Sequence, residues 1–280
     1  MKFVDIKNDI AFRKIFGNEN KKEILISFLN AVLGFTGKRK IVTVTILNPF
    51  QLPDILKYKT TVIDIKATDQ NGHYYIIEMQ VADKGNFEKR IQLYAAKAYV
   101  SQIEKGDNYH LLKPTIFIGI LNFNFTKSKK YLSQHITCDP ETKEQLLSDI
   151  EYNFIELLKF DKTIAECKNL VDKWTYFIKN AENLSVIPDN INDKGLSEAY
   201  GDANQMSWTK EELELYDYAK IRERDEYEER EKAVQNALEK KDIETIKNAI
   251  ELGLPNDSIS KLTKLPIEKV SELVNILKNK

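Results

Sequence analysis

Two acidic residues on neighbouring predicted strands are the side chains whose spacing most suggests chemistry. Asp64 and Glu78 lie at equal distances from the centre of a Gln-Asn-Gly loop at residues 70–72. A three-residue hairpin loop that ends in a left-handed glycine would place them opposite each other, with Cβ atoms about 5 Å apart. Because side chains alternate along a strand, Lys66 and Gln80 join them on the same face. Two carboxylates, a lysine and an amide therefore collect at one place.

Carboxylates this close repel each other unless a cation neutralises them. A hard divalent cation such as Mg²⁺ binds carboxylate, carbonyl and water oxygens, and it can acidify a bound water and stabilise charge at a scissile phosphate. Lys66 or Gln80 could then orient the water or contact the phosphate. The same alternation also describes a strand face that is open to solvent, so the interpretation depends on whether the sheet is covered. The opposite face of the hairpin is apolar and core-like: Ile63, Ile65, Ala67, Tyr75, Ile77, Met79 and Val81.

A nearly all-apolar strand predicted over residues 115–123 indicates that the sheet is covered on both faces. The hairpin strands are predicted over Thr61–Ala67 and His73–Val81, and the β-branched segment Ile41–Leu47 is a further strand. Apolar residues at helical spacing predict the covering helices over Asn8–Phe16, Lys21–Leu33 and Phe87–Ile103. The expected fold is a three-layer α/β arrangement, in which buried acids need a partner.

Several short motifs follow one another over roughly residues 5–125. They are Asn8-Asp9-Ile-Ala-Phe-Arg-Lys-Ile-Phe-Gly17, Asp64-Ile-Lys-Ala-Thr-Asp-Gln-Asn-Gly72, Tyr75-Ile-Ile-Glu-Met-Gln80, Arg90-Ile-Gln-Leu-Tyr94 and Gly106-Asp-Asn-Tyr109, followed by the apolar strand. In this order they resemble the recombination-promoting nuclease (Rpn) and transposase family of the PD-(D/E)XK nuclease superfamily. Within them, Asp64 and then Glu78-Met79-Gln80 resemble the superfamily signature Asp…(Asp/Glu)-x-Lys.

The resemblance implies a metal-dependent DNA endonuclease that hydrolyses phosphodiester bonds and is linked to mobile elements, recombination or phage defence. It also implies a PD-(D/E)XK-like mixed sheet flanked by helices. Carried over to this chain, it implies that the carboxylates of Asp64 and Glu78 and the backbone carbonyl of Met79 bind Mg²⁺, or another divalent cation such as Mn²⁺ or Ca²⁺.

Other residues of these motifs are expected to act beside the metal. Gln80 stands where the superfamily usually has a lysine, and since an amide carries no positive charge we expect Lys66 to supply it. Asp9 matches an acid that often joins such sites, but an acid at a helix start is equally favoured by the helix dipole. Arg90 and Tyr94 lie one helical turn apart and could contact DNA, although Arg90 could instead form an ion pair with the site carboxylates.

The chain changes character after about residue 160, where the pattern becomes helical. We therefore expect a nuclease core over residues 1–160 and an all-helical C-terminal region over residues 161–280. A helix over Glu211–Lys232 carries ten acids and five bases, which is typical of a solvated connector, although it could also bind a basic partner. Residues 243–277 predict a helix-turn-helix-like hairpin, whose second helix could enter the major groove of DNA. Because that helix is only weakly basic, a hairpin that packs or forms a homodimer is the favoured interpretation.

Composition excludes several other classes of protein. The 280 residues are 42% hydrophobic and 10% aromatic, which is enough for a sizeable core. Only two cysteines occur, so no disulfide framework is expected, and no apolar segment suits a membrane; we therefore expect a cytoplasmic protein.

The formal net charge of −1 hides an uneven distribution, because residues 1–50 hold nine bases and four acids. DNA is therefore expected to meet the N-terminal half.

Two other functions remain compatible with the sequence. The first is a catalytically degraded module that uses the nuclease fold to bind nucleic acid, and Gln80 motivates it. The second is a protein-interaction or toxin–antitoxin-like regulator that acts through the acidic helix at residues 211–232. The sequence does not distinguish DNA from RNA as the substrate.

Overall fold

The computed structural model describes residues 2–47, 50–51, 61–62, 64–83 and 85–278. The chain divides into two compact units, Met1–Ala219 and Lys220–Lys280. The first unit contains the sheets and most of the helices. Its α-helices are α1 (Asp9–Phe16), α2 (Lys22–Leu33), α3 (Phe87–Val100), α4 (Leu170–Asn180), α5 (Lys194–Ala203) and the first residues of α6 (Lys210–Glu251).

A six-stranded sheet with the order β1-β4-β5-β6-β8-β7 forms the centre of the first unit. Its strands are β1 (Val44–Leu47), β4 (Ile65–Asp69), β5 (Tyr74–Gln80), β6 (Thr115–Leu121), β7 (Leu132–His135) and β8 (Ile150–Glu156). β1, β4 and β5 are antiparallel neighbours, β5, β6 and β8 run parallel, and β7 pairs antiparallel with β8. β2 (Phe50–Gln51) and β3 (Thr61–Val62) form a separate antiparallel pair. The central sheet is therefore mixed, as predicted.

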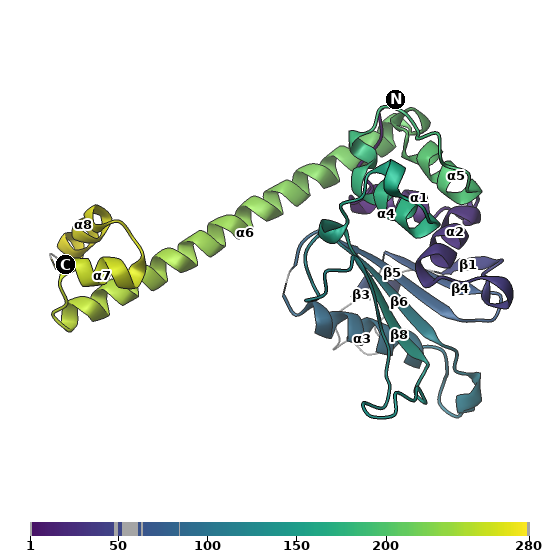
Figure 1. Ribbon diagram of the computed structural model, residues 1–280, viewed down its shortest axis with the longest axis horizontal. Coiled ribbons are helices and arrows are strands. Elements are labelled where there is room, and N and C mark those ends of the chain that lie inside the picture. Colours follow the sequence, from purple (N-terminus) through teal and green to yellow (C-terminus); the bar gives the residue numbers. More distant parts are fainter. Residues whose placement is uncertain (1, 48–49, 52–60, 63, 84, 279–280) are drawn as a thin grey trace. The chain divides into compact units, whose positions relative to one another are not determined.

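Helices cover both faces of this sheet (Figure 1). On one face α1, α2, α4 and α5 share a large apolar core, in which the Trp174 ring packs edge-on against Phe28 at 5.6 Å between centroids. On the other face α3 packs through Phe87, whose ring lies 6.5 Å from that of Phe154. All seven residues of β6 are buried between the two layers. The predicted three-layer α/β class is confirmed.

The hairpin of β4 and β5 has the register expected from its loop. Ile65 pairs with Ile77, and the same register brings Asp64 opposite Glu78. Gly72 has φ +79°, and its N–H donates to the carbonyl three residues earlier at 3.0 Å. This left-handed glycine closes the three-residue loop, since a side chain at that φ would be strained.

The hairpin differs from the expectation at the start of its first strand and at the end of its second. The first strand is not continuous over Thr61–Ala67, because β4 begins only at Ile65 and Asp64 lies in a bend before it. Ile63, expected in the core, lies outside the described residues. Val81, also expected in the core, is exposed because β5 ends at the residue before it.

The second unit is a small helical body made of the rest of α6, α7 (Asn256–Thr263) and α8 (Ile267–Lys278). The residue after α7, Lys264, has a left-handed φ of +59° and turns the chain toward α8. The buried core of this unit consists of Ile246, Ala249, Ile259, Val270 and Val274. Among the described helices of the whole chain, none combines the length and the apolar character that crossing a membrane requires.

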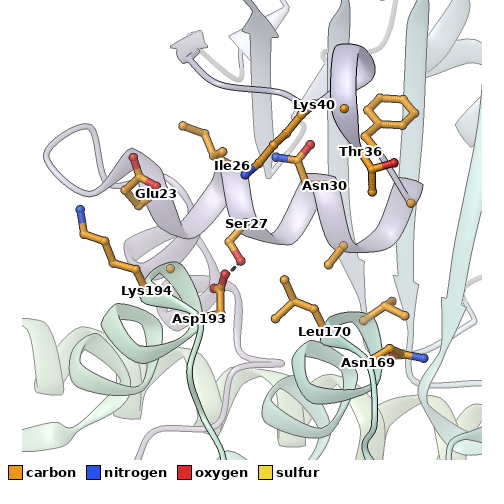
Figure 2. Close-up of a pocket in the computed structure, with 16 residues that line it drawn as sticks. Glu23, Ile26, Ser27, Asn30, Thr36, Lys40, Asn169, Leu170, Asp193 and Lys194 are labelled. Carbon is orange, nitrogen blue, oxygen red and sulfur yellow. Dashed lines mark hydrogen bonds between the residues drawn. The ribbon is translucent and has the colours of Figure 1, made fainter.

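A pocket of about 560 Å³ lies beside α2 in the first unit (Figure 2). At its wall, Ser27 Oγ donates to Asp193 Oδ1 at 2.5 Å and accepts the indole N–H of Trp174 at 3.0 Å. Asp193 Oδ1 also accepts the backbone N–H of Leu196 at 2.8 Å, which caps α5. These polar groups join α2 to α4 and α5. The residues that line this pocket include none of the predicted site residues, so it belongs to the helical layer.

Candidate active site

Asp64 is held in the bend before β4 by contacts to both of its carboxylate oxygens. Oδ1 accepts hydrogen bonds from Arg13 Nε at 3.0 Å and Nη2 at 2.8 Å, and Oδ2 accepts the backbone N–H of Met79 at 2.9 Å. The side chain is buried, with 9% of it exposed. The ion pair with Arg13 and the hydrogen bond from the Met79 N–H therefore fix the orientation of this carboxylate. Strand alternation does not set it, because Asp64 lies in a bend.

Glu78 lies beside Asp64 on the adjacent strand and is also buried. Its Oε2 accepts the backbone N–H of Asp64 at 3.4 Å. Burial raises the pKa of Glu78, and the negative charge of Asp64 raises that pKa further. Burial likewise raises the pKa of Asp64, although hydrogen bonds from the Met79 N–H and the Arg13 guanidinium counteract it. The predicted pair of neighbouring acids is thus a buried pair in which each carboxylate needs compensating positive charge.

Gln80, which stands where the superfamily usually has a lysine, binds the guanidinium of Arg90. Its Oε1 accepts a hydrogen bond from Arg90 Nη2, and its Nε2 donates to the carbonyl of Ala82 at 2.7 Å. The Arg90 guanidinium also lies 5.2 Å from the centre of the Phe87 ring. The positive charge of Arg90 lowers the pKa of Glu78 against the effects of burial, so this guanidinium acts on one acid of the pair.

Tyr94 and Lys66 lie in different surroundings on this side of the sheet. Tyr94 is half-buried, and burial followed by the negative charge of Glu78 raises the pKa of its hydroxyl. Lys66 is buried, which lowers the pKa of its ammonium group. That ammonium lies 5.2 Å from the centre of the Tyr74 ring, at the first residue of β5. The structure therefore groups Arg90 and Tyr94 with Glu78 and directs Lys66 toward Tyr74.

α1 brings two charged residues to the acid pair. Asp9 is the first residue of this helix, after Asn8, whose side chain accepts the N–H groups of the first turn. The negative charge of Asp9 contributes to raising the pKa of Asp64. Arg13 follows Asp9 by one turn and therefore lies on the same side of α1. Arg13 was not among the residues predicted for the site, and its spacing of four from Asp9 is the signal that could have identified it.

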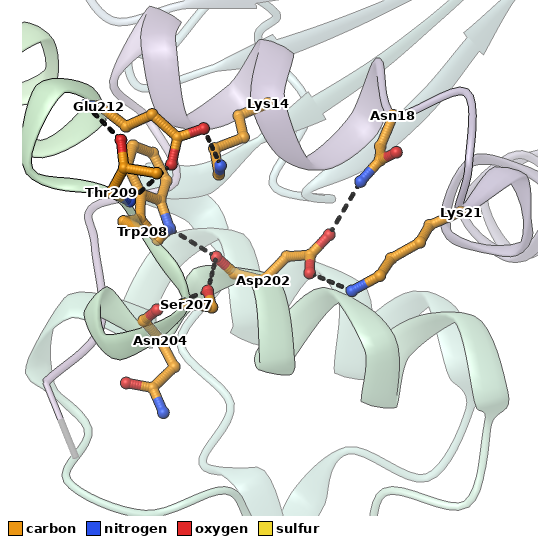
Figure 3. Close-up of polar contacts among 9 residues, drawn as sticks. All are labelled: Lys14, Asn18, Lys21, Asp202, Asn204, Ser207, Trp208, Thr209 and Glu212. Atoms are coloured by element: carbon orange, nitrogen blue, oxygen red, sulfur yellow. Dashed lines mark hydrogen bonds and ion pairs between the residues drawn. The ribbon is translucent and has the colours of Figure 1, made fainter.

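Contacts with the following helices hold α1 in place (Figure 3). Lys14 forms an ion pair with Glu212 near the start of α6. Beyond the end of α1, Asn18 Nδ2 donates to Asp202 on α5 at 3.4 Å, and Lys21 forms an ion pair with the same carboxylate. Two later helices thus fix the helix that carries both charged site residues.

The donor set of the site fits a hard divalent cation. Asp64 and Glu78 offer buried carboxylate oxygens on adjacent strands, and such oxygens are the ligands that Mg²⁺ prefers. Within the described part of the chain, no group of three or more His, Cys, Asp or Glu side chains is arranged to hold a metal ion. A cation at this place would therefore depend on the two carboxylates together with backbone or water oxygens.

The fold and the site together define the class of protein. A mixed sheet with helices on both faces, and with neighbouring acids on its antiparallel hairpin, is consistent with the PD-(D/E)XK nuclease fold. The chain belongs to the PD-(D/E)XK nuclease family transposases, since the sequence model of that family matches residues 6–237. This match confirms the predicted resemblance, and membership of the family supports a nuclease-like function. Comparison with curated proteins found no match. Comparison with solved structures likewise found none.

Proposed function

We propose that this protein is a metal-dependent DNA endonuclease that hydrolyses phosphodiester bonds. The observation that carries the proposal is the buried pair of Asp64 and Glu78, which pack side by side although burial penalises both charges. Membership of a nuclease family makes phosphodiester hydrolysis the chemistry that such a pair would serve.

Asp64, Glu78 and the backbone carbonyl of Met79 would hold Mg²⁺ or another divalent cation such as Mn²⁺ or Ca²⁺. When bound, the cation would acidify a water molecule and stabilise negative charge at the phosphate. The surrounding residues of the chain would position the substrate. We propose that Arg90 and Tyr94, which share a side of α3, contact the DNA backbone at this place.

Three further residues are proposed to support catalysis. Gln80 would do so by holding the Arg90 guanidinium beside Glu78, which brings positive charge to a position where the amide itself has none. Lys66 remains a candidate to contact the phosphate, although doing so requires its ammonium to leave the ring of Tyr74. Asp9 would act from α1 through its negative charge on Asp64, and not as a third ligand of the cation.

Nicking of supercoiled plasmid tests this proposal through its dependence on metal. We expect cleavage with Mg²⁺ or Mn²⁺ and none with EDTA. Glu78→Gln should abolish cleavage, because it removes one of the two carboxylates. Glu229→Gln, the same change at an exposed position of α6, should leave cleavage intact. Cleavage that persists in EDTA would refute the metal dependence.

A second candidate function is a nucleic-acid-binding module without catalysis, and Gln80 in place of a lysine is the observation that favours it. In that case no divalent cation would produce cleavage. DNA binding would nevertheless persist and weaken steeply with salt, because contacts to phosphates release counterions. A gel-shift series at increasing salt, carried out beside the nicking assay, separates the two functions.

We also propose where the DNA and a second copy of the chain would bind. Residues 1–50 hold nine bases and four acids, whereas Glu211–Lys232 holds ten acids and five bases, so DNA should approach the first and avoid the second. The C-terminal helices would form a homodimer, which sedimentation equilibrium can detect; a monomer at all concentrations would contradict it. We also propose that the protein acts in the cytoplasm, in mobile-element recombination or in phage defence. In a cell-based assay of recombination or of phage resistance, Asp64→Asn should remove the effect of the wild-type protein.

A further inference from the structure

The Arg13 guanidinium occupies the carboxylate that the metal would need. Its Nε and Nη2 both donate to Asp64 Oδ1, at 3.0 and 2.8 Å, while Oδ2 is taken by the backbone N–H of Met79. The arginine side chain is 39% exposed, whereas that of Asp64 is 9% exposed. Arg13 is therefore the more exposed partner of this ion pair, and its guanidinium occupies Asp64 Oδ1, an oxygen that the cation would need.

The same arginine neutralises the acids of the site. Asp64 and Glu78 are both buried, and the negative charge of Asp9 also acts on Asp64. The positive charge of Arg13 acts on both buried carboxylates, because it opposes the rise in the pKa of each. A divalent cation between the two acids would perform the same neutralisation, so Arg13 and the cation are alternatives at Asp64.

The side chain of Arg13 can leave Asp64 without movement of its helix. Its backbone carbonyl accepts the N–H of Gly17 at 2.8 Å, which closes the end of α1. The neighbouring Lys14 is anchored to Glu212 on α6, as described above. The guanidinium is the exposed end of a long and flexible side chain, so rotation about its own bonds is sufficient to free Asp64.

We propose that Arg13 is an internal counter-cation that competes with the divalent cation for Asp64, so that metal binds only as the guanidinium leaves the carboxylate. This inference rests on the proposed function, since it concerns the same two acids. It makes Arg13 a regulator of metal affinity, and the affinity is lower than the two carboxylates alone would provide.

Direct measurement of Mn²⁺ binding to the full chain tests the inference without any need for cleavage. The electron paramagnetic resonance signal of free Mn²⁺ gives the dissociation constant for the wild type and for Arg13→Gln. We expect Arg13→Gln to bind Mn²⁺ about tenfold more tightly or better, which corresponds to about 1.4 kcal/mol. Arg224→Gln removes the same charge at a position 71% exposed on α6 and should bind like the wild type.

Two further variants separate the possible failures. Arg13→Lys keeps the charge and should bind Mn²⁺ within a few-fold of the wild type. If Arg13→Gln does not fold, Arg13→Lys still tests the inference, since Mn²⁺ binding tenfold tighter than that of the wild type would show that the charge at this position does not compete with the metal. Asp64→Asn in the Arg13→Gln background should abolish the tight binding; binding that survives would place the ion elsewhere and overturn the inference. Equal or weaker binding by Arg13→Gln would overturn the competition alone. Absence of Mn²⁺ binding in every variant would overturn the proposed function and the inference with it.

Discussion

Replacing Gln80 with leucine should destabilise the first unit, because it removes the acceptor that holds Arg90. Gln80 is buried, its Oε1 accepts from Arg90 and its Nε2 donates to the carbonyl of Ala82 at 2.7 Å. Within the described residues, the buried Nε of Arg90 has no hydrogen-bond partner, so the guanidinium depends on Gln80. A hydrogen bond to a charged group contributes about 1.5–3 kcal/mol, and leucine has a similar volume. We therefore expect Gln80→Leu to lower the free energy of unfolding by about 2 kcal/mol.

Urea unfolding followed by tryptophan fluorescence measures this loss in the first unit. Both tryptophans of the chain, Trp174 and Trp208, lie in that unit. Gln92→Leu on α3 is the matched control, since the Gln92 amide donates to the carbonyl of Glu88 at 2.8 Å in an exposed position. The control should change stability by less than about 0.5 kcal/mol. Equal, small changes in both variants would refute the argument that Gln80 holds the partly buried guanidinium of Arg90.

Three other predictions concern stability and are measured by the same urea assay. Glu212→Gln breaks the partly exposed ion pair with Lys14 and should cost less than about 1 kcal/mol; a larger loss would contradict this. Gly119→Ala would place a methyl group 2.9 Å from the Phe154 ring and should cost about 1–3 kcal/mol, so unchanged stability would contradict it. Burial alone would raise the pKa of Glu156, but hydrogen bonds from its neighbours lower that pKa below the usual 4.5. The ionised side chain therefore stabilises the fold above this value, and the contribution is lost as the pH falls through the folded-state pKa. Glu156→Gln should flatten the acid side of the stability curve; a slope like that of the wild type would contradict this.

The geometry of the acid pair could be predicted because it follows from a local rule. The Gln-Asn-Gly loop has three residues and ends in Gly72, and this turn leaves one register for the two strands. That register brings Asp64 opposite Glu78. The helices on both faces follow from another local rule, because a strand as apolar as β6 must be buried on both sides.

The contacts made by the long cationic side chains could not be predicted in this way. Arg13 precedes Asp64 by 51 residues, and no spacing rule connects a helix to a bend so far along the chain. Alternation placed Lys66 beside the acids, but a lysine reaches several ångströms from its strand, and here its ammonium lies over Tyr74. Arg90 was expected to contact either DNA or the acids, whereas its hydrogen bond to Gln80 became visible only in the folded structure.

The helices after residue 160 show a similar limit. Their apolar spacing predicts helices, but it does not say what each helix packs against. In the structure α4 and α5 contribute Trp174 and Tyr200 to the same core as α1 and α2, and compact packing continues to Ala219. The partner of an amphipathic helix depends on contacts between distant segments, which a periodic pattern does not record.

Cleavage of supercoiled plasmid by the wild type and by Asp64→Asn, side by side in Mg²⁺, tests the central claim most directly. Asparagine has the size of the aspartate but cannot provide its charge, so circular dichroism should show a folded variant. Asp225→Asn, at an exposed position on α6, is the matched control. We predict that the wild type and the control nick the plasmid while Asp64→Asn leaves it supercoiled. Nicking by Asp64→Asn at the wild-type rate would contradict the assignment of this site as the nuclease centre.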